Sequence, residues 1–236
     1  MTRPVHVLGT NHLLELLPRE DKKRVTSGME RLVCDQGHVL YKPNTPMTHV
    51  YFPLSGVVSL VTVLADAGKR VECVTIGNEG MAGLPLLHGV ADTHLDVFFQ
   101  VPGEAMRMSA SAFAEEIARR GALAHLALRY AEAFFRSAAQ AAACHITHAV
   151  EQRLSSLILM CHDRVVSDTI QLTQEFLAQM LRVRRSSVSP VASVLQRSGL
   201  IRYRRGVIVV LNRAGLEARS CECYLAVRGH FERLLQ

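Results

Sequence analysis

Six short segments rich in Val, Tyr, Phe and Leu recur between residues 30 and 109, and their regular spacing strongly constrains the fold. They cover residues 39–41, 50–52, 57–64, 71–76, 95–101 and 105–108, and glycine, proline and asparagine separate them. Short apolar runs bounded by turn residues are typical of β-strands. This spacing predicts a β-sandwich or small barrel, preceded by a short helix at about residues 13–26.

The sequence changes character at residues 109–111, and residues 111–165 are rich in helix-forming side chains and contain no proline. Ser111 is the predicted N-cap, and Gly121 is predicted to separate a short helix from a long one. In the long helix, mostly small residues follow heptad spacing: Ala127, Tyr130, Phe134, Ser137, Ala141, Cys144 and His148. We interpret this seam as a dimer contact, because so long a helix outreaches one small barrel. The alternative is packing on the chain's own β domain.

The charge of the chain is concentrated at its C-terminal end. The last 71 residues contain eleven arginines and five acids, which accounts for the whole formal charge of +6. No acid lies between Glu175 and Glu217, although eight arginines do. A neutral part joined to a basic part predicts a sensor connected to a polyanion-binding domain. The alternative is a basic surface that is merely solvated.

The basic end has the pattern of a winged helix-turn-helix. After a predicted hinge at residues 165–168, helices are expected at residues 173–181 and 185–197, and strands at 200–203 and 207–211. Asn212 is the predicted cap of a final helix that ends near residue 234. The alternative is a helical pair packed on the core with its arginines in solvent.

Two sets of residues are the candidate DNA contacts. Those expected to read bases in the major groove are Arg184, Arg185, Ser186, Ser187 and Ser189. Those expected to hold phosphates are Thr173 and Gln174 at a helix start, with Arg202, Arg204 and Arg205 on the wing.

The chain resembles the cyclic-AMP receptor/fumarate-nitrate regulator (CRP/FNR) family of bacterial transcription factors. Residues 50–60 (VYFPLSGVVSL), 77–87 (GNEGMAGLPLL), 172–188 (LTQEFLAQMLRVRRSSV) and 199–211 (GLIRYRRGVIVVL) carry the resemblance. It implies an α+β fold with an N-terminal jelly-roll-like β-roll sensor at residues 1–120. A dimerisation helix and hinge at 121–167 and a winged helix-turn-helix at 168–236 would follow.

The resemblance also implies a function. The protein would be a homodimer that binds a palindromic operator in double-stranded DNA and regulates transcription. A small-molecule effector would bind the β-roll, and RNA polymerase would be a further partner if the protein activates.

The sensor departs from the family's cyclic-nucleotide cassette. Met81 stands where cyclic-nucleotide-binding members carry a glutamate, and no lysine or arginine lies between Arg70 and Arg107. Burying a phosphate without a cation is costly, so cyclic AMP is not the expected effector. The candidate effector pocket consists of Gly80, Met81, Gly83, Leu84, Thr93 and His94.

An iron–sulfur cluster is excluded because Cys34 is the one cysteine in the first 70 residues. The histidines of the β domain are interpreted as structural, not as haem ligands.

The predicted DNA reader has two departures of its own. Arg182 occupies a turn position that is usually glycine, and Pro190 falls inside the second helix. They support a second hypothesis, an effector-binding or protein-interaction module with a degenerate DNA reader. Restoring glycine and a non-proline residue should create tight DNA binding only under this second hypothesis.

Four cysteine and histidine residues form two separate candidate pairs of metal ligands. Cys144 and His148 are one helical turn apart and would need symmetry mates to complete a metal site, so packing is preferred. Cys221 and Cys223 do not form a zinc set, because no second cysteine pair exists. No metal and no cofactor are therefore expected. The chain has no P-loop, nucleophile elbow, dinucleotide fingerprint or HExxH motif, so it is not expected to be an enzyme.

A cytoplasmic location is expected. The longest apolar runs, residues 157–161 and 207–211, are far shorter than the about 18 residues of a membrane-spanning helix. The N-terminus, with Arg3 and interrupted apolar patches, does not resemble a signal peptide. Six cysteines without disulfide spacing fit a reducing compartment.

Overall fold

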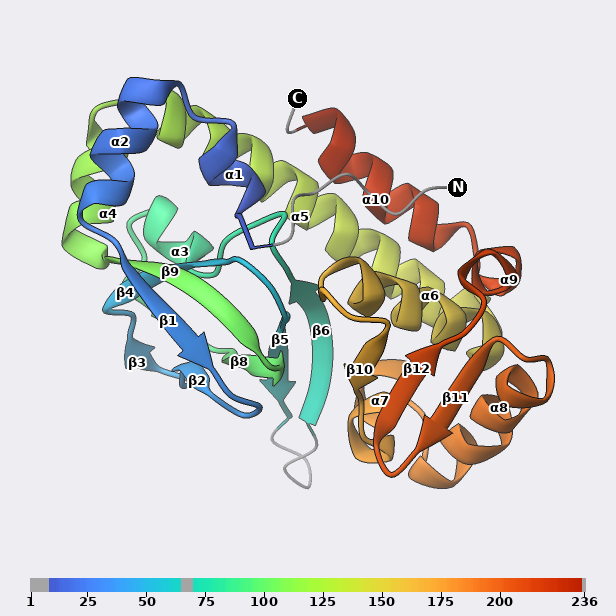
Figure 1. Ribbon diagram of the computed structural model, residues 1–236. Helices are drawn as coiled ribbons and strands as arrows, with labels where there is room; N and C mark the ends of the chain where they lie inside the picture. The colour runs from blue at the N-terminus through green and yellow to red at the C-terminus, as the bar shows by residue number, and fades with distance from the viewer. Residues whose placement is uncertain (1–8, 65–69, 235–236) are drawn as a thin grey trace.

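The computed structural model describes residues 9–64 and 70–234, and Figure 1 shows a β domain and a helix-rich domain bridged by a long helix. Residues 1–8, on which the signal-peptide prediction partly depends, lie outside the described residues. The predicted fold class, an N-terminal β domain followed by a long helix and a C-terminal winged helix-turn-helix, is confirmed.

The β domain consists of antiparallel sheets whose strands follow most of the predicted segments. One sheet has the order β1-β9-β4, a second β2-β8-β5-β6, and a short third one β3-β7. The strands are β1 (Glu30–Cys34), β2 (Val39–Tyr41), β3 (Thr45–Pro46), β4 (His49–Pro53), β5 (Val57–Val63), β6 (Arg70–Ile76), β7 (Asp92–Thr93), β8 (Asp96–Val101) and β9 (Gly103–Ser109). Apolar side chains such as Phe52 and Phe99 form its core.

Helices cover one end of the β domain. The predicted opening helix is two helices, α1 (His12–Glu15) and α2 (Arg19–Ser27), because Pro18 cannot continue the first. A short α3 (Leu84–Leu87) follows the loop after β6.

The prediction that Ser111 is an N-cap is wrong, because α4 (Ala110–Ala118) begins two residues earlier than that cap would place it. Ser109 is its cap, and the Ser109 hydroxyl accepts a hydrogen bond from the Ala112 N–H at 3.2 Å.

The long helical region is broken once more than predicted. Gly121 does separate α4 from α5 (Ala122–Thr147), but α5 ends where the sequence analysis expected it to continue. Ala149 is extended, and its N–H donates to the Gln152 side chain, which starts α6 (Val150–Asp163). The helix therefore turns at His148–Ala149, and α6 packs with the C-terminal domain.

The C-terminal domain has the predicted winged architecture with one additional strand. Its elements are β10 (Thr169–Gln171), α7 (Gln174–Leu181), α8 (Arg185–Arg197), β11 (Ile201–Arg204), β12 (Val207–Val210) and α9 (Arg213–Arg219). The sheet order is β10-β12-β11. Side chains of α6, α7, α8 and this sheet share one apolar core. The predicted final helix is two helices, since Ser220 is extended and a separate α10 (Cys223–Leu234) follows.

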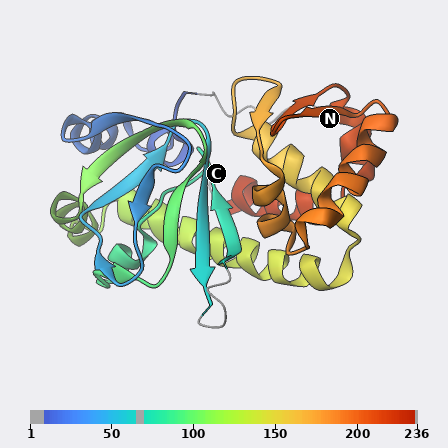
Figure 2. The same cartoon turned by 90° about the horizontal axis from the view of Figure 1, so that it is seen from below.

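Helix α10 returns along α5 to the β domain (Figures 1 and 2). The Phe231 ring of α10 stacks on the Tyr130 ring of α5 with 6.0 Å between centroids. Ala127 and Tyr130 are fully buried within the chain, and Cys144 lies beside Cys221. The predicted dimer seam on α5 is therefore largely occupied by the chain itself. The alternative, packing on the chain's own β domain, is confirmed for part of this face, because Ala127 and Tyr130 share an apolar cluster with side chains of the β strands. Sequence spacing did not identify α10 as the other partner.

Candidate DNA-binding surface and effector pocket

The start of α7 has the predicted cap. The Thr173 hydroxyl accepts a hydrogen bond from the Phe176 N–H at 3.2 Å, which confirms the expected helix start. The Gln174 amide donates to the Ser189 hydroxyl at 2.8 Å and so links the first turn of α7 to α8. Free N–H groups at this helix start provide a favourable place for a phosphate.

Helix α8 spans the residues that the sequence predicts and has two distinct faces. Val188, Ala192 and Leu195 are buried in the domain core. All five residues predicted to read bases are solvent-exposed at the start of the helix, where Arg184 is the N-cap and Arg185, Ser186, Ser187 and Ser189 lie in the first turns. Pro190 lies inside α8 on the exposed side, and the helix continues through it to Arg197. The exposed start of α8 can therefore enter a groove.

The turn between α7 and α8 adopts the predicted left-handed conformation. Arg182 has φ 53° and ψ 44°, which costs a residue with a Cβ about 1–2 kcal/mol. Its guanidinium Nη2 donates to the Glu72 carbonyl of β6 at 3.3 Å. Arg182 thus connects the DNA-reading helices to the β domain.

The wing places further arginines beside the same surface. Arg202, Arg204 and Arg205 are exposed. Arg205 and Gly206 both have positive φ, the requirement of a tight two-residue hairpin turn. The wing is held against α8, because the Tyr203 N–H donates to the Gln196 side chain at 2.7 Å.

The three elements border one depression. Its volume is about 400 Å³, and its lining residues are Thr173, Gln174, Arg185, Tyr203, Arg205 and Gly206. Four of the predicted DNA contacts, from the start of α7, the start of α8 and the wing, thus meet at one hollow. Two guanidinium groups beside a helix N-terminus suit an anion such as a DNA phosphate.

The β domain contains a pocket of about 500 Å³ at the predicted effector position. Met81, Gly83, Leu84, Thr93 and His94 line it, as predicted. Gly80 does not, because it packs against Tyr130 so closely that an added Cβ would overlap the ring. None of the described lining residues is a lysine or arginine, and apolar side chains predominate. Phe134 of α5 also lines the pocket, so an occupant would contact the long helix directly.

A buried ion pair that the sequence analysis missed joins the two domains. Arg164, just after α6, donates through Nε to Glu79 in the loop after β6 at 3.1 Å, and a second nitrogen also pairs with that carboxylate. The Arg164 and Glu79 side chains are only 7% and 9% exposed. The guanidinium also donates to Thr75 at 2.6 Å, and the Gly77 N–H donates to Glu79 at 2.9 Å. The 85 residues between the partners explain why sequence spacing gave no sign of the pair.

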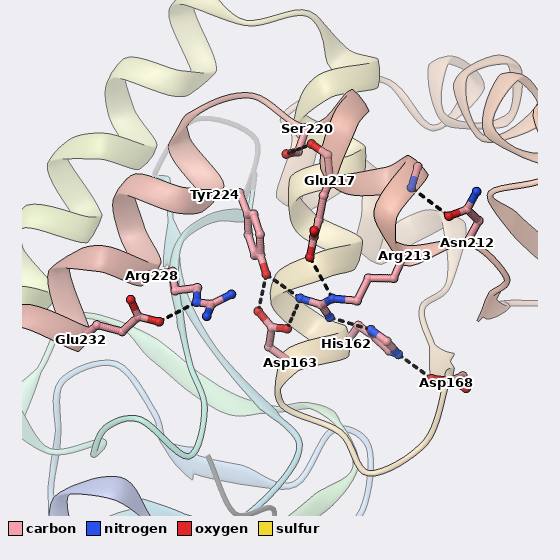
Figure 3. A network of polar contacts seen from close by, with 11 residues as sticks. His162, Asp163, Asp168, Asn212, Arg213, Glu217, Ser220, Tyr224, Arg228 and Glu232 are labelled. Carbon is pink, nitrogen blue, oxygen red and sulfur yellow. Dashed lines mark hydrogen bonds and ion pairs between the residues drawn. The ribbon is translucent and has the colours of Figure 1, made fainter. Parts of the chain in front are cut away.

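A second polar network, shown in Figure 3, connects α6, α9 and α10 through Arg213. The Arg213 guanidinium pairs with Asp163 at 2.7 Å and donates to the Tyr224 hydroxyl at 2.7 Å. It also donates to the His162 Nδ1 at 2.9 Å. Since that nitrogen accepts, the His162 Nε2–H donates to Asp168 at 2.8 Å. The segment predicted to be a hinge, residues 165–168, is thus fastened at its last residue.

Comparison with known proteins identifies the DNA-reading domain. Residues 152–219 match the Crp-like helix-turn-helix domain family. No curated protein sequence matches the chain.

Solved structures match over most of the chain. A CRP-family transcriptional regulator from Thermus thermophilus has 20% identity and a TM-score of 0.65, with 81% of this chain and 96% of that chain covered. FixK2 from Bradyrhizobium japonicum has 16% identity and a TM-score of 0.64, with 82% and 98% covered. A CooA variant from Carboxydothermus hydrogenoformans has 17% identity and a TM-score of 0.61, with 90% and 96% covered.

The protein is therefore of the class that couples a β-roll to a winged helix-turn-helix. The predicted resemblance to the CRP/FNR family is confirmed at residues 152–219, which match the Crp-like helix-turn-helix domain. The chain as a whole shares its fold with the solved structures. The family match begins within α6, whose side chains share the core of the C-terminal domain. The domain boundary at residues 167 and 168 stays a prediction. Among the described residues, no helix is both long and apolar enough to cross a bilayer.

Proposed function

We propose that the protein is a homodimeric transcriptional regulator that binds a palindromic operator through its winged helix-turn-helix. The observation that carries this proposal is the single exposed surface formed by the arginine- and serine-rich start of α8, the capped start of α7 and the wing. Base contacts from α8 would specify sequence, and the wing arginines would hold phosphates. We place the protein in the cytoplasm and assign it no catalysis.

The two departures of the reader do not favour the hypothesis of a degenerate domain. Helix α8 continues through Pro190, and Arg182 occupies its left-handed turn while contacting β6.

The direct test of operator binding is selection of bound sequences from a random duplex pool by the purified protein. A recovered palindrome with half-sites about 10 bp apart, centre to centre, would support the proposal. Recovery of nothing from the pool, with and without cell extract, would contradict it.

DNA affinity is expected to fall steeply with salt. Each protomer has seven arginines from Arg182 to Arg205. If about half of the fourteen arginines in a dimer neutralise phosphates, a plot of the logarithm of the DNA association constant against the logarithm of salt concentration should have a slope of about −6. Fluorescence anisotropy with the selected duplex at several salt concentrations measures this slope. A salt-insensitive complex would contradict the phosphate contacts.

Two arginine variants should separate base reading from phosphate binding. Arg185→Ala should relax the preference for the selected operator, with a loss of about 1–3 kcal/mol of discrimination at one base pair. Arg204→Ala on the wing should weaken all duplexes about equally and make the salt slope shallower by about one unit per protomer. Parallel titrations of operator and scrambled duplexes measure both effects. If both variants lost affinity equally for operator and scrambled duplexes, the assignment of base reading to Arg185 and phosphate binding to Arg204 would be wrong.

The dimer contact we propose lies on the face of α5 that α10 leaves open. Leu128, Phe135 and Ile146 are 54%, 68% and 87% exposed. Leu128, Phe135 and Ala142 follow one row of seven-residue spacing, and Ala139 and Ile146 follow a neighbouring row. A second α5 related by a two-fold axis would cover this apolar stripe.

Phe135→Arg is expected to convert the dimer to a monomer, because the contact would bury two like charges near its axis. Sedimentation velocity measures the change, and folding is checked by circular dichroism. Val33→Arg is the matched control, since Val33 is a similarly exposed apolar residue on β1. A variant Phe135→Arg that remains dimeric would place the interface elsewhere.

The effector we propose is a largely apolar small molecule, not cyclic AMP. Met81 and Leu84 line the pocket, and none of its described lining residues is a lysine or arginine that could pair with a phosphate. Phe134 of α5 also lines the pocket, so a bound effector would contact this helix directly.

A further inference from the structure

Four potential metal-ligand atoms converge where α5 ends and α10 begins. They belong to Cys144, His148, Cys221 and Cys223, and all lie within 4.8 Å of one another. The Cys144 and Cys221 sulfurs are 3.6 Å apart, and the Cys223 sulfur is 3.5 Å from the His148 Nδ1. In the sequence these residues form two incomplete pairs, because 77 residues separate Cys144 from Cys221. The return of α10 along α5 brings the pairs together.

The spacing of the four atoms matches a tetrahedral zinc site. Zinc binds sulfur at about 2.3 Å and imidazole nitrogen at about 2.0–2.1 Å. In a regular tetrahedron these bonds place sulfurs about 3.8 Å apart and a sulfur about 3.6 Å from a nitrogen. The observed separations of 3.6 Å and 3.5 Å agree with these values. Three thiolates with one imidazole are a common structural zinc set.

Neighbouring polar groups are arranged as supporting contacts to these ligands. Glu222 accepts from the His148 Nε2–H at 3.1 Å, which leaves the Nδ1 lone pair directed at the cluster. The Gln140 amide donates to the Cys223 sulfur at 3.0 Å. The Ser156 hydroxyl lies 3.2 Å from the Cys221 sulfur. Hydrogen bonds to metal-bound sulfur and a carboxylate behind a ligating histidine are the usual second layer of a zinc site.

The charge of the surroundings also suits a thiolate-bound zinc ion. Zinc with three thiolates and a neutral imidazole has a net charge of −1. The buried guanidinium of Arg153 is within electrostatic range of Cys144 and Cys221 and would balance that charge. The three cysteines are 8%, 2% and 5% exposed, so four protein ligands would close the coordination shell. A closed site is structural and leaves no position for a substrate.

We propose that each chain binds one zinc ion through Cys144, His148, Cys221 and Cys223. The ion would fasten the junction between α9 and α10 to the end of α5, at the turn between α5 and the DNA-reading domain. The cysteines would bind as thiolates, and the three protons would be released to solvent. The zinc site does not depend on DNA binding, and it is tested without DNA.

The experiment uses the full chain, purified with reductant, stripped with chelator and titrated with Zn²⁺ or Co²⁺ alone. We expect about one zinc ion per chain and the visible absorption of tetrahedral cobalt with thiolate charge-transfer bands. Cys144→Ser and Cys221→Ser should lose these bands. Cys34→Ala is the matched control, because Cys34 is a buried cysteine of the β domain, and it should retain them. Glu222→Gln should weaken zinc binding about 10-fold.

A second measurement uses the wild-type chain, so its outcome does not depend on how the variants fold. Alkylation mapped by mass spectrometry should show that zinc protects Cys144, Cys221 and Cys223 and that chelator exposes them. The rates at Cys34, Cys73 and Cys161 should not change. The proposal would be overturned if the chain showed no tetrahedral cobalt absorption, or if Cys34→Ala lost the absorption bands as fully as Cys144→Ser and Cys221→Ser do. It would also be overturned if the cysteines were protected only by an oxidative Cys144–Cys221 disulfide.

Discussion

Glu79→Gln is expected to lower the free energy of unfolding by about 3–5 kcal/mol, because it leaves the buried Arg164 guanidinium without a counter-charge. The pair lies between the loop after β6 and the end of α6, and both side chains are almost completely buried. The remaining partner of the guanidinium, the Thr75 hydroxyl, is neutral. Urea denaturation followed by circular dichroism measures the loss. The melting temperature should fall by about 10 °C in a chain of this size.

Glu104→Gln is the matched control for this experiment. Glu104 also pairs with an arginine of the same domain, Arg31, but their side chains are 34% and 59% exposed. Solvent-exposed pairs contribute about 0–1 kcal/mol, so this substitution should change stability little. If the two variants lost equal stability, the buried pair would not be the contact that holds the domains together.

The stability of the protein is expected to decrease with rising pH through the titration of Glu72. Burial raises the pKa of Glu72 to about 8, although the Ser59 hydroxyl donates to its carboxylate at 2.7 Å. In the unfolded chain the pKa is near 4.5. Below the unfolded pKa both states are protonated, so the contribution of Glu72 to stability is fully present there. As pH rises towards 8, the unfolded state releases a proton that the folded state retains, and the contribution is lost at up to about 1.4 kcal/mol per pH unit.

Glu72→Gln should remove this pH dependence. The variant remains neutral and can still accept the Ser59 hydrogen bond, so it should be increasingly more stable than wild type from about pH 5 to about pH 8. The difference should reach several kcal/mol, measured by urea denaturation across that range. Glu104→Gln should follow the wild-type profile. If the free energy of unfolding changed with pH in the same way for wild type and Glu72→Gln, the Glu72 carboxyl would not titrate across this range.

The elements that could be predicted from sequence are those specified by local chemistry. Helix α8 has the predicted bounds because its buried face repeats at helical spacing, and Thr173 caps α7 through contacts three residues away. Arg182 takes the left-handed turn because the fold requires it at that position. The Ser109 cap was missed because Ser111 offers the same chemistry two residues later. The turn at His148–Ala149 has neither glycine nor proline to mark it.

The features that could not be predicted depend on contacts between distant parts of the chain. The amphipathic face of α5 was recognised, but its partner is α10, about 100 residues later, and heptad spacing does not identify a partner. Five of the six residues proposed for an effector site line one pocket of the β domain, because they cluster in sequence; that the pocket binds an effector stays a prediction. The contact between Glu79 and Arg164, and the convergence of Cys144 and His148 with Cys221 and Cys223, could not be predicted, because a spatial cluster from distant segments has no sequence spacing to recognise.

The path of α10 has a consequence for how the protein is made. The β domain and α5 leave the ribosome first, but Phe231, which stacks on Tyr130 of α5, is synthesised only after the whole DNA-reading domain. Domains generally fold in order of synthesis, so the newly made β domain must wait with an uncovered apolar strip on α5. Chaperones have access to that strip during this interval. If synthesis stopped within the wing, the chain would have most of its DNA-reading domain but would lack the helix that covers α5 beside the β domain.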